Sequence, residues 1–182
     1  PLYMAAFLCL LFYRNRPPWQ VAFLDVGQGD CAVLQEESGR TVVIDCGSSD
    51  EKGVGTYRLL PYLKYMGVQK VDAVFVSHAD EDHISGIREL LEQTELPVEH
   101  LVCYAEAGEK MEPLLCLAEE REVPVLGMAA GNSLHIGQMQ MTCLAPSMGD
   151  ISSDENNRSL VLLEEQESVR MLFTGDMGEE EE

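Results

Sequence analysis

The sequence predicts an α/β protein, a four-layer αβ/βα sandwich in which two sheets pack together and helices cover them outside. Three observations support this fold class. The chain begins with short β-branched runs separated by glycine turns, which are typical of hairpins. Its middle alternates strand-like and helix-like segments, and its end returns to hairpins. Such an order favours layers of sheet and helix over a helical bundle.

Length and composition set the limits of the interpretation. A chain of 182 residues is long enough for one domain with a substantial core. The formal net charge of -20 argues against a broad nucleic-acid-binding face, because that affinity comes largely from Lys and Arg. The 6 Cys form no C-x-x-C pair, which argues against a zinc ribbon and favours buried free thiols.

The first residues are almost wholly apolar from Leu2 to Tyr13. This run is shorter than the roughly 20 residues that a bilayer crossing takes. Arg14 and Arg16 follow it, and a Pro-Pro-Trp sequence then breaks any helix. We therefore expect residues 1–19 to be the clipped end of a transmembrane helix with its linker, in a chain excerpted from a longer protein. A signal-peptide core and a core helix are the alternatives.

The first predicted sheet begins with three strands in hairpins. The β-branched runs and the turn glycines predict strands over Gln20–Asp25, Cys31–Leu34 and Thr41–Asp45. A helix with an apolar face is predicted from Thr56, closed by Gly67.

The later elements follow from the same patterns. Helices are predicted from Ile84 to Gln93 and from Lys110 to Arg121. The remaining strands are predicted over Val71–Val76, Val98–Tyr104, Val123–Leu126, a hairpin from Asn132 to Ala145, Ser159–Leu163 and Val169–Phe173.

The stretch Ser77-His78-Ala79-Asp80-Glu81-Asp82-His83 stands between a predicted buried strand and a predicted helix. His78 and Asp80 are two residues apart, so they share one side of an extended segment. Asp82 and His83 follow where the chain turns into the helix, and their side chains can point toward a second, neighbouring metal position. One short loop can thus supply ligands to two metals, beside a helix N-terminus that favours an anion. The alternative is a solvated polar turn with an acidic helix cap.

This loop resembles the His-x-His-x-Asp-His signature of the metallo-β-lactamase superfamily, with Asp80 in place of the second His. Together with Phe23–Asp30 and Asn156–Leu162, it resembles the ComEC competence proteins, which are membrane channels for DNA uptake that carry a lactamase-like domain. The resemblance implies a metallo-β-lactamase-like domain over residues 20–182 whose C-terminal part is missing.

The resemblance also implies a site. Asp176 corresponds to the Asp that bridges two metals, and Asp82 and His83 would be the catalytic residues. The implied metal ligands are His78, Asp80, Asp82, His83, Asp176 and, from a less specific match, Asn157. Four residues are expected to support the Ser77–His83 loop, here called the metal loop, without binding a metal themselves: Asp45, Gln28, Gly29 and Asp30. A plain turn Asp is the alternative for Asp45, and a glycine-rich hairpin turn is the alternative for Gln28–Asp30.

Two divalent metal ions are expected, with manganese favoured and zinc or magnesium as alternatives, because Asp80 adds a hard oxygen where relatives have an imidazole. By resemblance the domain is a nuclease that degrades the non-imported strand, with single-stranded DNA as substrate. Its other partner is the transmembrane channel portion of the same polypeptide, in a bacterial cell membrane. The alternatives are another hydrolase of this fold, acting on a thioester, lactone or lactam, and a non-catalytic docking domain.

Overall fold

The computed structural model describes residues 19–93, 96–149, 158–166 and 169–177, together with Tyr3, Met4 and Phe7. The predicted membrane anchor lies almost wholly outside these residues. Trp19, which was expected in the linker, is the first residue of strand β1. None of the helices in the described ranges combines the length and the apolar character that a bilayer crossing requires.

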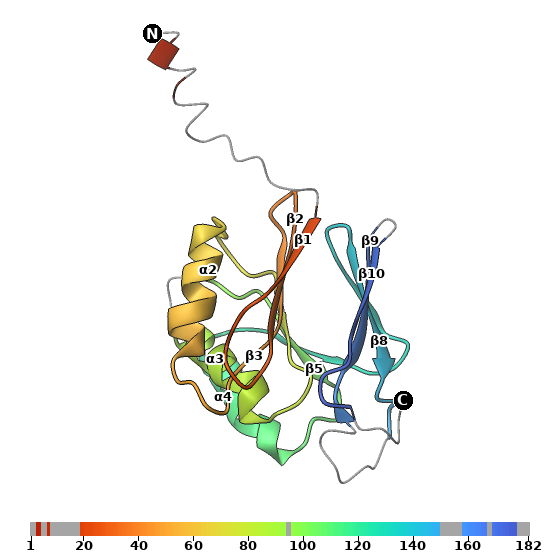
Figure 1. The fold of residues 1–182 in the computed structure, drawn as a ribbon. Coiled ribbons are helices and arrows are strands. Elements are labelled where there is room, and N and C mark those ends of the chain that lie inside the picture. Colours follow the sequence, from red (N-terminus) through yellow and green to blue (C-terminus); the bar gives the residue numbers. More distant parts are fainter. Residues whose placement is uncertain are drawn as a thin grey trace.

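A six-stranded sheet in the order β1-β2-β3-β4-β5-β6 forms the middle of the molecule (Figure 1). The first three strands pair antiparallel, as the hairpins predicted, and β3 to β6 pair parallel. The strands are β1 Trp19–Phe23, β2 Cys31–Glu36, β3 Thr41–Cys46, β4 Ala73–Phe75, β5 Leu101–Tyr104 and β6 Val125–Met128.

The helices connect the parallel strands of this sheet. A π-helical turn, Gly55–Leu59, leads into α2 (Leu60–Tyr65), and a 3-10 turn, Glu109–Met111, leads into α4 (Glu112–Glu120). Helix α3 spans Glu81–Glu92 and therefore begins before the predicted Ile84. Because of this earlier start, Asp82 and His83 lie in the first helical turn.

The second sheet is an antiparallel meander in the order β10-β9-β8-β7. Both predicted hairpins are present. The strands are β7 Ser133–Ile136, β8 Met139–Ala145, β9 Val161–Gln166 and β10 Val169–Phe173.

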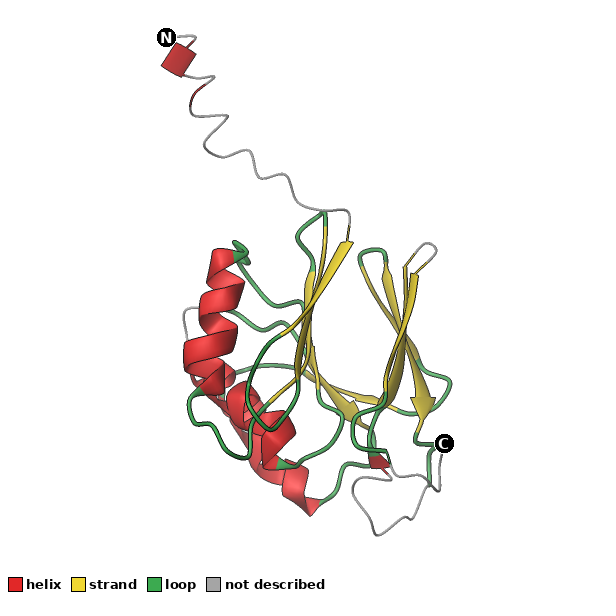
Figure 2. Ribbon diagram, in the orientation of Figure 1, coloured by secondary structure: helices red, strands yellow, loops and turns green. Residues whose placement is uncertain are grey.

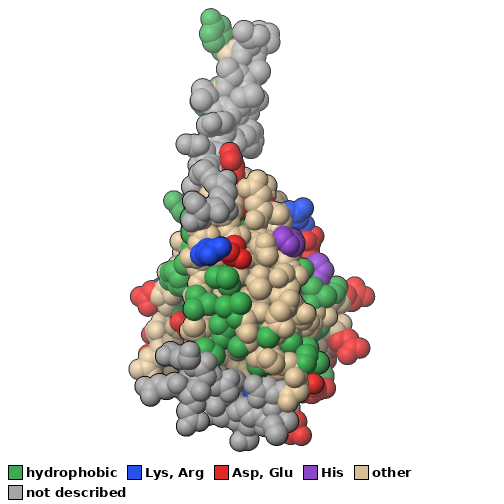
Figure 3. Space-filling model, turned by 90° about the vertical axis from the view of Figure 1, so that its right-hand side faces the viewer, with side chains coloured by type: hydrophobic (Ala, Val, Ile, Leu, Met, Phe, Trp, Pro, Cys, Tyr) green, Lys and Arg blue, Asp and Glu red, His purple; other side chains and the backbone are tan. Residues whose placement is uncertain are grey.

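The elements stack as helices, six-stranded sheet and four-stranded sheet (Figure 2). The predicted arrangement of two inner sheets with helices outside is confirmed, and three of its four layers are formed by described residues. Figure 3 views the outer face of the four-stranded sheet, where hydrophobic side chains are exposed. Leu144 and Leu172 are 48% and 56% exposed there.

The inner strands β2 to β5 of the six-stranded sheet are buried on both faces, which explains why they are apolar at nearly every position. Alternate residues face opposite sides of a strand. Val33 and Val43 belong to the core under the helices, whereas Leu34, Val42 and Phe75 belong to the core between the sheets. Burying each of these side chains stabilises the fold by about 1.5–3 kcal/mol.

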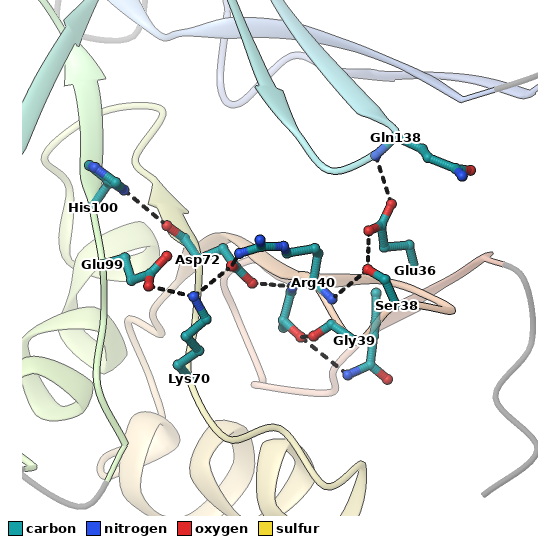
Figure 4. A network of polar contacts seen from close by, with 11 residues as sticks. Glu36, Ser38, Gly39, Arg40, Lys70, Asp72, Glu99, His100 and Gln138 are labelled. Carbon is teal, nitrogen blue, oxygen red and sulfur yellow. Dashed lines mark hydrogen bonds and ion pairs between the residues drawn. The ribbon is translucent and has the colours of Figure 1, made fainter.

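A polar network lies where the parallel strands begin (Figure 4). Asp72 accepts hydrogen bonds from Arg40 Nη1 at 2.6 Å and from the Thr41 N–H at 2.8 Å. Glu36 accepts a bond from the Gln138 N–H at 2.8 Å and so links the two sheets. Strands β3 and β4 run parallel, so their carboxyl ends lie together at the opposite end of the sheet, where the predicted metal loop follows β4.

Candidate metal centre

Asp45 connects the end of β3 to the predicted metal loop. Its backbone has a φ of 51°, a left-handed conformation that Asp tolerates better than most residues. Its buried carboxylate accepts a hydrogen bond from the Ser77 N–H at 2.7 Å through Oδ1. The other oxygen, Oδ2, lies 3.1 Å from Nδ1 of His83. One side chain thus fixes both the entry to the loop and the imidazole at its far end.

Three potential ligands meet at this point: His78, His83 and Asp176. One donor atom of each lies within 4.8 Å of the others. Nε2 of His83 is 3.4 Å from Oδ1 of Asp176, and the two imidazole rings are 4.1 Å apart between centroids. The structure therefore brings Asp176, which follows the last described strand, against the loop that follows β4.

The imidazoles are oriented as in a metal site. Nδ1 of His83 is bonded to Asp45, and Nδ1 of His78 lies 3.0 Å from Oγ of Ser77. A hydrogen bond at one ring nitrogen leaves the other free to bind metal. Nε2 of His78 is buried and has no hydrogen-bond partner among the described residues. Two such nitrogens beside a carboxylate are a donor set that fits a divalent ion.

The charges around the cluster shift its proton affinities in opposite directions. Burial lowers the pKa of His83, but the bond to Asp45 and the charges of Asp45, Asp176 and Asp30 outweigh it and raise this pKa to about 9. Burial and the neighbouring His83 lower the pKa of His78. The carboxylates thus create a strongly negative potential at His83, which favours a cation.

Asp80 and Asp82 lie beside this cluster rather than within it. Oδ2 of Asp80 is 3.7 Å from Nε2 of His78, while its Oδ1 forms an ion pair with Lys110 at 3.0 Å. The expected convergence of all five loop and strand ligands is therefore incomplete in the described residues. Asp82 and His83 are successive residues in the first turn of α3, and successive side chains of a helix point in directions about 100° apart.

Gly29 and Asp30 pack against the metal loop through their backbones, whereas Gln28 bonds to the segment that follows β3. The Asp30 N–H donates to the carbonyl oxygen of Asp82 at 3.1 Å, and the Gln28 N–H donates to Asp50 at 2.7 Å. A Cβ on Gly29 would lie 2.3 Å from the carbonyl oxygen of Gly47, so glycine permits this crossing. Burial raises the pKa of Asp30, whose carboxylate is 4.0 Å from Nδ1 of His83.

Asn157, the remaining predicted ligand, lies outside the described residues. Three residues at the site were not singled out from the sequence: Ser77, Lys110 and Arg158. Ser77 and Arg158 each belong to a motif that supported the family resemblance, so their position was a usable signal. Lys110 comes from a separate helical turn, and no local pattern connects it to Asp80.

The sequence of the chain is similar to a known protein family and to several bacterial proteins. The profile of the metallo-beta-lactamase superfamily matches residues 24–126. The chain is 32% identical to ComE operon protein 3 of Bacillus subtilis (strain 168), over 97% of this chain and 24% of that protein. It is 37% identical to ribonuclease J of Mycoplasma pneumoniae, over 35% of this chain and 12% of that protein.

A solved structure agrees with these matches. The metallo-beta-lactamase fold protein YhfI from Bacillus subtilis superposes with a TM-score of 0.62 at 18% identity, covering 87% of this chain and 62% of that one. The chain spans about a quarter of the length of ComE operon protein 3. From the profile match and the shared fold, the chain belongs to the metallo-beta-lactamase superfamily, and within it the chain resembles the ComEC competence proteins.

Proposed function

We propose that this domain is a metal-dependent phosphodiesterase that cleaves nucleic acid. The observation that carries this proposal is the cluster of His78, His83 and Asp176, with both imidazoles fixed through Nδ1. Divalent ions bound there would supply Lewis acidity toward a phosphate group and toward water.

The residues of the chain have distinct roles in this proposal. His78 and His83 offer Nε2, and Asp176 offers a carboxylate between the loop and the second sheet. Asp45 keeps the proton of His83 on Nδ1. Asp82 lies in the first turn of α3 next to His83 and is proposed as a further ligand. Asp80 can bind the same metal ion as His78 if its ion pair with Lys110 opens.

The names of two similar proteins support the choice of substrate. One similar protein is named for the ComE operon and another is named a ribonuclease, which supports chemistry on a nucleic-acid backbone. We propose single-stranded DNA as the substrate, and degradation of the strand that is not imported as the role. The domain would then act as part of a bacterial membrane protein whose other portion forms the transmembrane channel.

We propose two divalent ions, with manganese favoured over zinc. Asp80 stands where the superfamily signature has an imidazole, and a charged oxygen suits manganese better than zinc. Replacing Asp80 with His should therefore shift the preferred metal toward zinc.

The test is cleavage of end-labelled single-stranded DNA, measured with each metal at fixed ionic strength because salt alone changes DNA affinity. We expect His83→Ala and Asp82→Ala to abolish cleavage with either metal. His135→Ala is the matched control, because His135 is an exposed strand residue of β7. Wild-type cleavage by the Asp82→Ala and His83→Ala proteins, with contaminating nuclease excluded, would disprove the proposal. Turnover of a thioester, lactone or lactam without DNA cleavage would do the same.

A further inference from the structure

A small, open hollow with a cavity volume of about 20 Å³ lies directly beside the metal centre. Ser77 and His78 form one wall of this hollow, and Tyr104, Met111 and Arg158 are among the residues that form the rest. Because His78 also belongs to the ligand cluster, the hollow and the metal centre share a wall. A ligand bound at this centre would therefore lie next to the residues that line the hollow.

Arg158 is held in a fixed orientation in the hollow. Its guanidinium carbon lies 5.4 Å from the ring centroid of Tyr104, a cation–π distance. Its Nη2 donates a hydrogen bond to the backbone carbonyl oxygen of Glu106. The hydroxyl of Tyr104 lies 2.7 Å from the carbonyl oxygen of Ser147, which positions the ring. The Leu160 N–H donates to the Ser77 carbonyl oxygen at 2.9 Å, so the segment carrying Arg158 is tied to the metal loop.

The guanidinium keeps donors available for a ligand. Arg40, Arg88 and Arg170 each form an ion pair with a carboxylate. Arg158 has no carboxylate partner in the described ranges, and its buried Nε has no hydrogen-bond partner there. A guanidinium has five N–H donors in a planar fork that matches two oxygens of a phosphate.

The charge of the whole chain makes this arginine unusual. Asp and Glu number 32 against 12 Lys and Arg, so most cations have an acidic neighbour available. Lys110, through its ion pair with Asp80, adds a second positive charge near the loop. The Tyr104 hydroxyl also donates a hydrogen bond to the Glu106 carboxylate at 3.0 Å, so the charges of Arg158 and Lys110 are accompanied there by the carboxylates of Glu106 and Asp80.

We propose that Arg158 binds a phosphate adjacent to the reacting one and so sets the register of the nucleic-acid strand on the metal centre. This inference rests on the proposed phosphodiesterase function and names the substrate contact. Because phosphate is common to every nucleotide, the contact is independent of sequence. A carboxylate also fits a guanidinium fork, so the test includes one.

The probe is thymidine 3′,5′-bisphosphate, which carries two phosphates but has no internucleotide bond to cleave. Binding to the metal-loaded full chain is measured by calorimetry and compared with thymidine 5′-monophosphate. We expect the wild type to bind the bisphosphate about 10- to 100-fold more tightly, as for a charge-assisted bidentate contact. Arg158→Ala should bind both nucleotides equally, and Arg158→Lys should retain only part of the preference. Arg170→Ala, an exposed arginine paired with Glu165, is the matched control.

Metal content and far-UV circular dichroism of each variant show whether the centre and the fold are intact. An unchanged bisphosphate preference in Arg158→Ala, or in Arg158→Lys if the Ala variant does not fold, would overturn the inference. So would a wild type that prefers succinate to phosphate or binds neither nucleotide. The two proposals can be told apart. If the wild type cleaves no DNA but its preference for the bisphosphate depends on Arg158, the phosphate contact is supported and the phosphodiesterase function is refuted.

Discussion

At the scale of single residues, Asp45 determines the geometry of the centre. It accepts a hydrogen bond from the Ser77 N–H and bonds to Nδ1 of His83. Because Asp45 holds a proton on Nδ1, Nε2 is the ring nitrogen that faces Asp176 and the ligand cluster, and a metal that binds there would displace the Nε2 proton.

The Asp45→Asn variant should weaken metal binding about 10- to 100-fold, as is usual for a residue that orients a metal ligand. Asn tolerates the left-handed backbone at this position, but its amide N–H₂ would donate to Nδ1 and move the proton of His83 to Nε2. Metal affinity measured by calorimetry checks this expectation. Asp50→Asn, whose carboxylate bonds to Gln28 and Ser48, is the control. Wild-type affinity in Asp45→Asn would show that the tautomer does not matter.

Glu164 is a buried acid that the proposed chemistry does not use. It lies in β9, is fully buried, and neither carboxylate oxygen has a hydrogen-bond partner among the described residues. Burial, with a smaller contribution from the charge of Glu165, raises its pKa from 4.5 to about 7. The folded state therefore holds this proton at pH values where the unfolded state has lost it.

Because the folded pKa is the higher one, Glu164 lowers the free energy of unfolding as pH rises between the two pKa values. From about pH 5 to about pH 8 the loss should be about 2.5 kcal/mol. Glu164→Gln cannot ionise, so this part of the pH dependence should disappear. Urea unfolding of both proteins across this range gives the comparison, with Glu165→Gln as control. Parallel pH profiles of the wild type and Glu164→Gln would contradict the shifted pKa.

At the scale of elements, the centre depends on the close approach of β3 to the start of α3. A Cβ on Gly47 would lie 2.4 Å from the carbonyl oxygen of Glu81 and 2.5 Å from the backbone nitrogen of His83. Both contacts are with backbone, which cannot rotate away as a flexible side chain could. Glycine at this position thus lets α3 place His83 against Asp45.

Gly47→Ala should therefore cost about 1–3 kcal/mol of stability and weaken metal binding as well, because α3 must move away from β3. The control is Gly131→Ala, where the added Cβ meets nothing within 4 Å and only the φ of 88° is unfavourable. That variant should lose about 1–2 kcal/mol without any change in metal affinity. Thermal unfolding and metal titration of both variants separate the two effects. Equal metal affinities in the two variants would contradict the role assigned to Gly47.

The elements themselves could be predicted from the sequence because their signals are local. The apolar face of α3 and the β-branched run of β4 identify each element without knowledge of its neighbours. The start of α3 was placed too late, since Glu81, Asp82 and His83 carry no apolar periodicity. Their polar side chains belong to a helical first turn, where backbone N–H groups favour acidic residues.

At the scale of the whole molecule, the part of the site that could not be predicted is the part made by tertiary pairing. The ion pair of Lys110 with Asp80 joins the 3-10 turn before α4 to the metal loop. The placement of Arg158 over Tyr104 joins the segment that precedes β9 to β5. No periodicity within one segment encodes such contacts. The family resemblance predicted His78, His83 and Asp176 as metal ligands, and the fold brings these three side chains close together.

A metal in this centre should stabilise the whole domain, because its ligands come from both sheets. His78 and His83 follow β4 of the first sheet, and Asp176 follows β10 of the second. A ligand that binds only the folded state adds about 2.7 kcal/mol at a concentration one hundred times its dissociation constant.

The most direct test of the account is the titration of zinc or manganese into the metal-free protein at fixed pH. Calorimetry measures the binding, and the melting temperature is determined with and without the metal. The wild type and His135→Ala should bind the metal and melt at a higher temperature with it. His78→Ala and Asp176→Ala should each lose most of the affinity and most of the rise in melting temperature. If a protein carrying both of these substitutions kept the wild-type affinity and stoichiometry, the metal centre would lie elsewhere and the account would be wrong.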